Sequence, residues 1–233
     1  MSGRFDDVRR RARRELRPLL SVSVGSAIRL AERLGGRFGV AARSPTAPEI
    51  VTNYTRGWVL FGVPHAASSR LEWRRFPQRA VITRETAHVP KRLRSIQRRA
   101  ELDLRHNEDF DAIIQHCQEG RDGWLTEEAV AAYRGLHDLG FVATVGAYRD
   151  DRLVGGLWGI AVGRVLGIMS MFHLEDHAGA LALAAVADQV AADERWSLVD
   201  CGVLNDNFKR YGAYEVPHDQ FCELVWRAAR PVA

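Results

Sequence analysis

The clearest fold signal in this chain runs from Phe141 to Ala192 and reads FVATVGAYRDDRLVGGLWGIAVGRVLGIMSMFHLEDHAGALALAAVADQVAA. Three runs rich in β-branched and aromatic residues, at 141–148, 153–160 and 165–172, are separated by turn-forming residues. This pattern predicts an antiparallel meander of three strands. The alanine-rich run at 178–192 follows, and it predicts a helix because alanine has the highest helix propensity.

Segments on both sides extend this pattern. Apolar residues recur at helical spacing between Phe110 and Cys117, and Thr126 can cap a second helix that reaches Leu139. After the alanine-rich run, the sequence predicts in order a buried strand at 197–203, a short helix at 205–211 and a last strand near 221–226. This element order is that of the GNAT acyltransferase fold. We therefore expect a mixed α+β protein with a GNAT-like domain built on a central, mostly antiparallel sheet.

The chain before that domain divides into two predicted parts. Residues 1–48 form a basic arm, because the first 50 residues hold 11 arginines against five acidic residues, and the arm ends in Ser44-Pro45-Thr46-Ala47-Pro48. Such an arm suits either a polyanionic partner or a solvated tail. Residues 49–105 combine strand-like runs with a basic segment and predict a smaller N-terminal α/β lobe. The GNAT-like domain then covers residues 106–233.

Composition places the protein among globular chains of a reducing compartment. Hydrophobic residues make up 46% of the 233 residues and charged residues 27%, which excludes a wholly disordered or collagen-like chain. The three cysteines form no C-x-x-C pair, so neither a disulfide framework nor a thiolate zinc site is indicated. The longest apolar stretch, 153–171, is interrupted by Arg164 and does not indicate a spanning helix. We expect a cytoplasmic protein without a membrane or metal partner.

The loop before the alanine-rich helix does not favour a coenzyme A donor. Residues 173–180 read HLEDHAGA. This loop is acidic and lacks the R/Q-x-x-G-x-G/A pattern, in which backbone N–H groups hold a pyrophosphate at a helix N-terminus. Acyl transfer on this fold would then need another donor.

A series of sequence blocks occurs in a fixed order along the chain. They are Tyr54-Thr55-Arg56-Gly57, Trp73 with Arg79-Ala80-Val81, His88-Val89-Pro90-Lys91-Arg92-Leu93-Arg94, Gly123-Trp124, Leu136-His137-Asp138-Leu139-Gly140, Leu153-Val154-Gly155-Gly156-Leu157-Trp158-Gly159, Ser170-Met171-Phe172, Asp200-Cys201 and Gly212-Ala213-Tyr214-Glu215-Val216-Pro217. Together, over residues 50–224, they resemble the leucyl/phenylalanyl-tRNA–protein transferase family.

The resemblance implies transfer of an aminoacyl group, with a hydrophobic side chain, from the 3′ end of a tRNA to a free amine. The amine would belong to a protein N-terminus, a peptide or a small molecule, and the product is an amide. Aminolysis of an ester needs positioning, a proton acceptor and oxyanion stabilisation, and it needs no cofactor. The resemblance makes Asp200 the first catalytic candidate, to orient or deprotonate the amine, while a structural role in a cap or an ion pair stays open. His173, which replaces a family serine, is the second candidate, as a proton carrier.

The remaining site residues also follow from the resemblance. It assigns substrate binding to Trp124, Leu157, Leu166, Met169, Ser170, Phe172, Val186 and Gly202, although the apolar members would equally suit an ordinary core. The basic segment supplies candidates for the tRNA acceptor stem, because dense cations suit phosphate contacts: Lys91, Arg92, Arg94, Arg98 and Arg99.

Two departures from the family pattern raise an alternative function. Gly202 stands where the family has a glutamine, and Met169 stands where it has a glutamate. The loss of these polar groups could redirect the activity to another substrate. It could also leave a catalytically impaired module that only binds tRNA or an N-terminal peptide.

Overall fold

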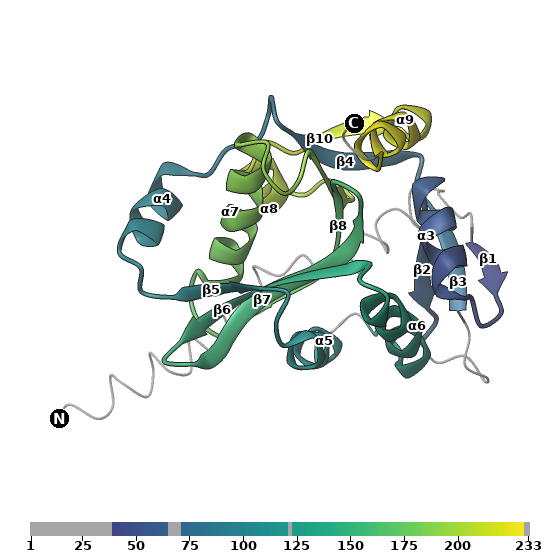
Figure 1. Cartoon of the computed structure of the whole chain (residues 1–233), viewed down its shortest axis with the longest axis horizontal. Helices are drawn as coiled ribbons and strands as arrows, with labels where there is room; N and C mark the ends of the chain where they lie inside the picture. The colour runs from purple at the N-terminus through teal and green to yellow at the C-terminus, as the bar shows by residue number, and fades with distance from the viewer. Residues whose placement is uncertain (1–38, 65–70, 121–122, 231–233) are drawn as a thin grey trace.

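The computed structural model describes residues 39–64, 71–120 and 123–230, and they form two β-sheets (Figure 1). The larger sheet contains, from edge to edge, β10 (Tyr214–Pro217), β4 (Gln78–Thr83), β9 (Leu198–Gly202), β8 (Val165–His173), β7 (Arg152–Val162), β6 (Val142–Arg149) and β5 (Asp103–His106). Its neighbouring strands are antiparallel except β8 and β9, which are parallel. The smaller sheet contains β1 (Gly39–Ala42), β3 (Leu71–Arg75) and β2 (Trp58–Gly62).

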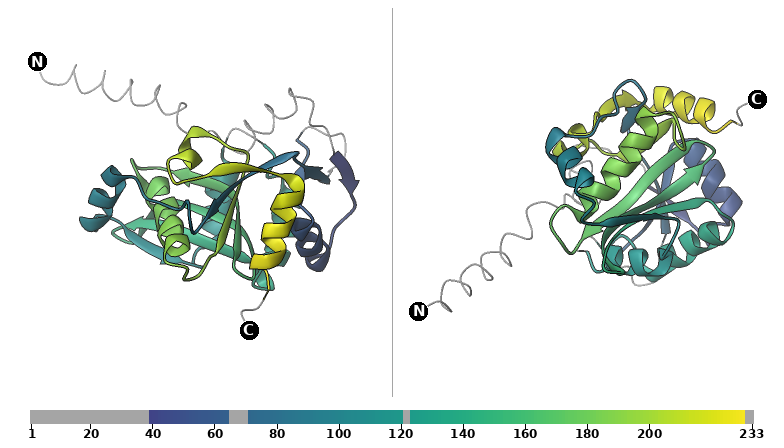
Figure 2. Two further views of the ribbon diagram at one scale, coloured as in Figure 1. Left: turned by 90° about the horizontal axis from the view of Figure 1, so that it is seen from above. Right: turned by 60° about the vertical axis from the view of Figure 1, so that its left-hand side comes forward.

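Helices cover both faces of the larger sheet (Figures 1 and 2). On one face lies α7 (Ala178–Ala191), and α4 (Lys91–Arg98) packs beside it. On the other face lie α5 (Phe110–Gln118) and α6 (Glu127–Asp138). The remaining helices of the described residues are α3 (Ala47–Thr55), α8 (Asp206–Lys209) and α9 (His218–Ala228).

Strand alternation divides the core into two layers. Side chains of successive strand residues point to opposite faces, so adjacent residues such as Leu157 and Trp158 belong to different layers. Leu157 packs with the buried residues of α7, whereas Trp158 packs with residues of α5 and α6 such as Tyr133. We call the face of the larger sheet that carries Trp158 the α5 face, and the opposite one the α7 face.

The sequence predicted the class of this fold correctly. The mixed α+β class with a mostly antiparallel sheet is confirmed, and so are the meander, the helices at 110–117 and 178–192, and the strand at 197–203. No helix among residues 39–64, 71–120 and 123–230 is long and apolar enough to cross a bilayer.

The prediction of a last strand near 221–226 was wrong, because this segment belongs to α9. Phe221 and Val225 lie four residues apart and are both fully buried, which is the spacing of one helix face. The last strand is instead β10, which pairs with β4 and ends at Pro217.

The sheets cut across the expected lobe at 49–105. The smaller sheet takes its strands from residues 39–75, whereas β4 and β5 join the larger sheet. The division at residue 105 stays a prediction about folding units. Most of the basic arm predicted at 1–48, namely residues 1–38, lies outside the described residues.

Candidate functional site

The short parallel ladder between β8 and β9 marks the place of the candidate site. It joins three residue pairs and ends at Gly167 with Asp200, although β8 continues to His173. β9 ends two residues after Asp200, at Gly202. Of the residues that the sequence assigns to catalysis and substrate binding on these strands, Leu166 lies within the ladder, opposite Val199, and the others lie at or beyond its end.

Asp200 is buried in a network that engages both of its carboxylate oxygens. Arg79 of β4 donates from Nε to Oδ1 at 3.1 Å and from Nη2 to Oδ2. Tyr54 of α3 donates its hydroxyl to Oδ2 at 3.0 Å, and the backbone N–H of Gly202 donates to Oδ1 at 2.9 Å. The side chains of Arg79 and Asp200 are each only 2% exposed. This bidentate pair is thus shielded from water, and its carboxylate is stabilised by charge-assisted hydrogen bonds.

Arg79 ties Asp200 to two further segments. Its Nη1 donates to the carbonyl oxygen of Gly57 at 3.3 Å, just after α3. Its guanidinium carbon lies 4.5 Å from the ring centroid of Phe221 in α9 and 5.8 Å from that of Phe76. The ion pair therefore joins α3, β4, β9 and α9 at one point, which is a structural reason to keep both partners.

Tyr54 reaches Asp200 only because residue 167 is glycine. A Cβ atom added at Gly167 would lie 2.2 Å from the Tyr54 hydroxyl oxygen, far inside van der Waals contact. Burial, followed by the charge of Asp200, raises the pKa of Tyr54 well above its ordinary value. The phenol therefore stays protonated and acts as a donor.

This geometry favours a positioning role for Asp200 over direct proton transfer. Its lone pairs are directed at Arg79, Tyr54 and the N–H of Gly202, so an attacking amine would have to displace one of these donors. The bond to Gly202 instead fixes the backbone where β9 ends. Gly202 has φ +71°, a left-handed conformation that favours glycine, and a Cβ atom there would meet open space.

Four of the predicted substrate residues gather on the α5 face: Trp124, Met169, Ser170 and Phe172. Trp124, Met169 and Phe172 belong to its buried cluster, and Ser170 is the cross-strand partner of Trp158. The register between β7 and β8 shifts at Trp158, so the adjacent residues Met169 and Ser170 lie on this same face. Trp124 and Trp158 stack with centroids 6.4 Å apart.

A small polar group lies within this aromatic face. The thiol of Cys117 in α5 lies beside Ser170 and Trp158, and burial raises its pKa to about 12. The indole N–H of Trp158 is fully buried and finds no hydrogen-bond partner among the described residues. Cys117 is thus a protonated packing residue, and its sulfur is the polar group that lies beside the buried indole of Trp158.

The other predicted pocket residues lie across the sheet. Leu157, Leu166 and Val186 are fully buried, and all three belong to the hydrophobic cluster on the α7 face. The sheet separates them from Trp124 and Met169. The two sets of residues therefore do not line one common pocket.

His173 also lies away from Asp200. It is exposed at the end of β8 and pairs with Gly155. A Cβ atom at Gly155 would meet Ala178 and Gly179 of α7, and cross-strand partners share a face. His173 therefore lies on the α7 face, opposite the side chains of Met169 and Phe172.

The basic segment forms α4 and presents its cations outward. Leu93 and Ile96 are its buried residues and pack toward α7. Arg94 pairs with Asp188 of α7 at 3.4 Å, and Arg99 pairs with Glu101 at 3.0 Å. Within this basic segment, Lys91, Arg92 and Arg98 form no ion pair with the described residues.

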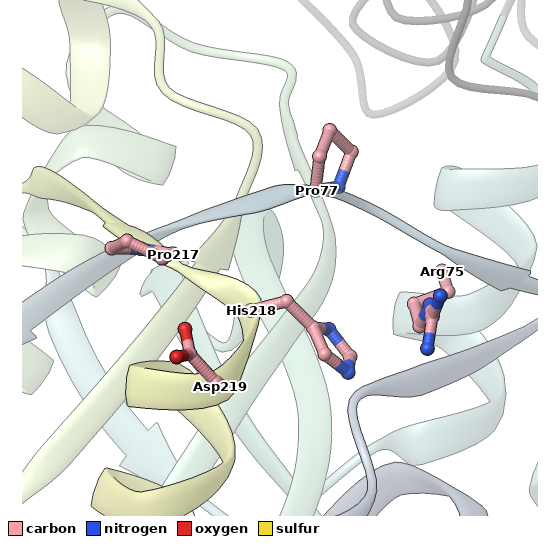
Figure 3. A pocket seen from close by; sticks show the side chains of 5 residues that line it. All are labelled: Arg75, Pro77, Pro217, His218 and Asp219. Carbon is pink, nitrogen blue, oxygen red and sulfur yellow. The ribbon is translucent and has the colours of Figure 1, made fainter.

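A pocket of about 330 Å³ opens at the N-terminus of α9 (Figure 3). Its lining residues are Arg75, Pro77, Pro217, His218 and Asp219, none of which the sequence predicted. The His218 ring packs against Gly57, where a Cβ atom would lie 2.3 Å from Cε1. Burial and the charges of Arg75 and Arg79 lower the pKa of His218.

Among the described residues, no group of three or more His, Cys, Asp or Glu side chains could hold a metal ion.

The chain is similar to known proteins over most of its length. The family model of leucyl/phenylalanyl-tRNA protein transferases matches residues 81–226. A leucyl/phenylalanyl-tRNA–protein transferase of Prosthecochloris aestuarii is 32% identical over 177 residues, which cover 74% of this chain and 90% of that protein. One of Rubrobacter xylanophilus is 31% identical over 185 residues, which cover 78% and 95%. A solved structure of a functionally unknown protein from Staphylococcus epidermidis aligns loosely, with a TM-score of 0.38 and 13% identity over 76% of this chain and 66% of that one.

These matches define the chain as an enzyme of the aminoacyl-tRNA–protein transferase class. It belongs to the leucyl/phenylalanyl-tRNA–protein transferase family. The resemblance and the enzyme class expected from the sequence are thereby confirmed.

Several residues of the candidate site could not be assigned a role from the sequence. Tyr54 and Arg79 were noticed only as parts of motifs, although an arginine in the apolar run Arg79-Ala80-Val81-Ile82 signals a buried cation that needs a carboxylate. Trp158 likewise stood within a motif without a role. His116, whose ring stacks on Phe172 with centroids 4.7 Å apart, gave no signal in the sequence.

Proposed function

We propose that this chain transfers a hydrophobic aminoacyl group, leucyl or phenylalanyl, from tRNA to the N-terminal amine of a protein or peptide. The observation that carries the proposal is the family match over residues 81–226, which includes all strands of the larger sheet except the first half of β4. The aromatic α5 face supports it, because Trp124, Met169 and Phe172 form a buried apolar cluster beside the parting strands. A large apolar side chain gains the most free energy from contact with such a cluster.

In this proposal the protein mainly positions two reactants. The ester of the aminoacyl-tRNA is already activated, so holding the amine against it converts a bimolecular step into an effectively unimolecular one. The Arg79–Asp200 pair keeps the end of β9 rigid, which serves that positioning. The outward cations of α4 would hold phosphates of the acceptor stem.

A second candidate function is binding without turnover. The observation that favours it is that both carboxylate oxygens of Asp200 already accept hydrogen bonds. In addition, open space surrounds Gly202, where the sequence resemblance implies a glutamine. A protein of this kind would bind aminoacyl-tRNA or an N-terminal peptide and form no amide.

A transfer assay separates the two functions. The full chain is incubated with leucyl-, phenylalanyl- and methionyl-tRNA and with a peptide that begins with arginine, and the products are read by mass spectrometry. The proposal expects the peptide to gain one leucyl or phenylalanyl residue. A matched peptide with an acetylated N-terminus should gain none. Measured tRNA binding without any product would refute the transferase and support the binding module.

A further inference from the structure

We propose that His116 of α5 is the proton acceptor for the attacking amine. His116 lies outside every motif that carried the family resemblance. Its assignment as proton acceptor rests on the proposed transfer reaction. Its ring is stacked on Phe172 of β8 with centroids 4.7 Å apart and planes inclined by 21°. Phe172 is one of the residues predicted to bind substrate, and the next residue of α5, Cys117, lies beside Ser170. The imidazole therefore borders the predicted substrate surface.

Other polar groups near this face are already engaged or buried, and the second imidazole, that of His137, stacks on Phe110 at the N-terminal end of α5. Asp200 is engaged by Arg79, Tyr54 and Gly202. Tyr54 and Cys117 are held protonated by burial, with the pKa of Cys117 at about 12. Imidazole is the side chain that ordinarily changes charge between pH 5 and 8, which suits a base that must be regenerated in each turnover.

The surroundings of His116 orient its ring. The Nδ1 atom is buried and makes no hydrogen bond among the described residues, and its nearest carboxylate oxygen is Oε2 of Glu119 at 3.5 Å. A proton on Nδ1 directed toward Glu119 leaves Nε2 with a free lone pair. The side chain is 28% exposed, so a reactant can reach it.

The titratable groups on the strands packed against α5 lie elsewhere. Tyr148 of β6 donates to Asp109 at the opposite end of α5. Arg152 of β7 and Arg149 of β6 both pair with Glu175, and His173 of β8 lies on the α7 face. Glu119 is therefore the charged group that faces His116 among the described residues.

The step balances without a further reactant. The amine nitrogen attacks the ester carbonyl carbon, and a C–N bond forms. Nε2 takes the proton that the amine loses. As the C–O bond to the ribose breaks, the same proton passes from Nε2 to the leaving ribose oxygen, which restores neutral His116.

Two variants test this assignment in single-turnover transfer with saturating enzyme. His116→Phe keeps a ring to stack on Phe172 but cannot accept a proton, and it should slow transfer about 100-fold or more at pH 7.5 while tRNA affinity stays within twofold. The wild-type rate should rise through one ionisation between pH 5 and 8, and this inflection should vanish in His116→Phe. His137→Phe is the matched control, because His137 stacks on Phe110 at 4.2 Å in the same way and should change the rate less than twofold.

Glu119→Gln provides a test that keeps the imidazole and changes only a 60% exposed side chain. Removing a carboxylate that favours the imidazolium should move the inflection to lower pH. An unmoved inflection, or a His116→Phe rate within threefold of the wild type with the same pH profile, would overturn the role of His116 alone. Absence of product from the wild type would overturn the transfer reaction itself and this proposal with it.

Discussion

Replacing Arg79 by methionine should destabilise the protein more than the loss of any surface cation. Asp200 would keep only the Tyr54 hydroxyl and the Gly202 N–H as donors, in a site where its side chain is 2% exposed. Removing one partner of a buried ion pair costs about 3–5 kcal/mol, because the other charge stays buried without compensation. Since whole domains are stable by only about 5–15 kcal/mol, this loss should be visible in every unfolding measurement.

The assay is urea unfolding at pH 7 followed by tryptophan fluorescence, with the free energy of unfolding compared between variants. Arg227→Met is the matched control, because Arg227 pairs with Glu223 one turn away on α9 and is 65% exposed, so its loss should cost about 0.5 kcal/mol or less. Adding Asp200→Asn to Arg79→Met removes the stranded charge and should recover roughly 1–3 kcal/mol. A cost below about 1 kcal/mol for Arg79→Met, or a double variant as unstable as the sum of the two single variants, would refute the reasoning.

Three further results are expected. Gly167→Ala should cost about 1–3 kcal/mol, because the new Cβ would lie 2.2 Å from the Tyr54 hydroxyl, whereas Gly135→Ala in α6, with nothing within 4 Å, should stabilise by about 0.5–1 kcal/mol; equal effects in urea unfolding would contradict the close contact. Cys117, with a pKa of about 12, should resist iodoacetamide at pH 8 in the native protein and react once urea exposes it, and peptide mapping that finds equal rates would exclude the buried thiol. Replacing Lys91, Arg92 and Arg98 together by alanine should weaken tRNA binding and lower the slope of log affinity against log salt by about 2–3, and an unchanged slope would remove α4 from the tRNA contact.

Much of the site was accessible from the sequence as a set of positions. Asp200, Trp124, Met169 and Phe172 were all singled out, and the structure brings these to the parting strands or to the α5 face next to them. Which of these side chains share one face of the sheet could not be predicted from the sequence. Leu157 was assigned to the same pocket as Trp124, although alternation along β7 places Leu157 and Trp158 on opposite faces.

The state of Asp200 depended on residues remote in sequence. Its partners Arg79 and Tyr54 lie 121 and 146 residues away, so no local pattern could reveal that both carboxylate oxygens are engaged. The same holds for His116, which meets Phe172 only because α5 packs across β7 and β8.

The sequence by itself determined the types of most predicted elements, the antiparallel meander and the family, because periodicity and motifs are carried by neighbouring residues. It misjudged 221–226, where a short apolar run suits a strand and a helix equally, and only packing of Phe221 and Val225 into the core selected the helix. The tertiary structure alone decided which side chains share a face and which carboxylate is neutralised by which cation. Those outcomes depend on strand register and on contacts between distant segments, and the free energy of such contacts appears only when the chain is folded.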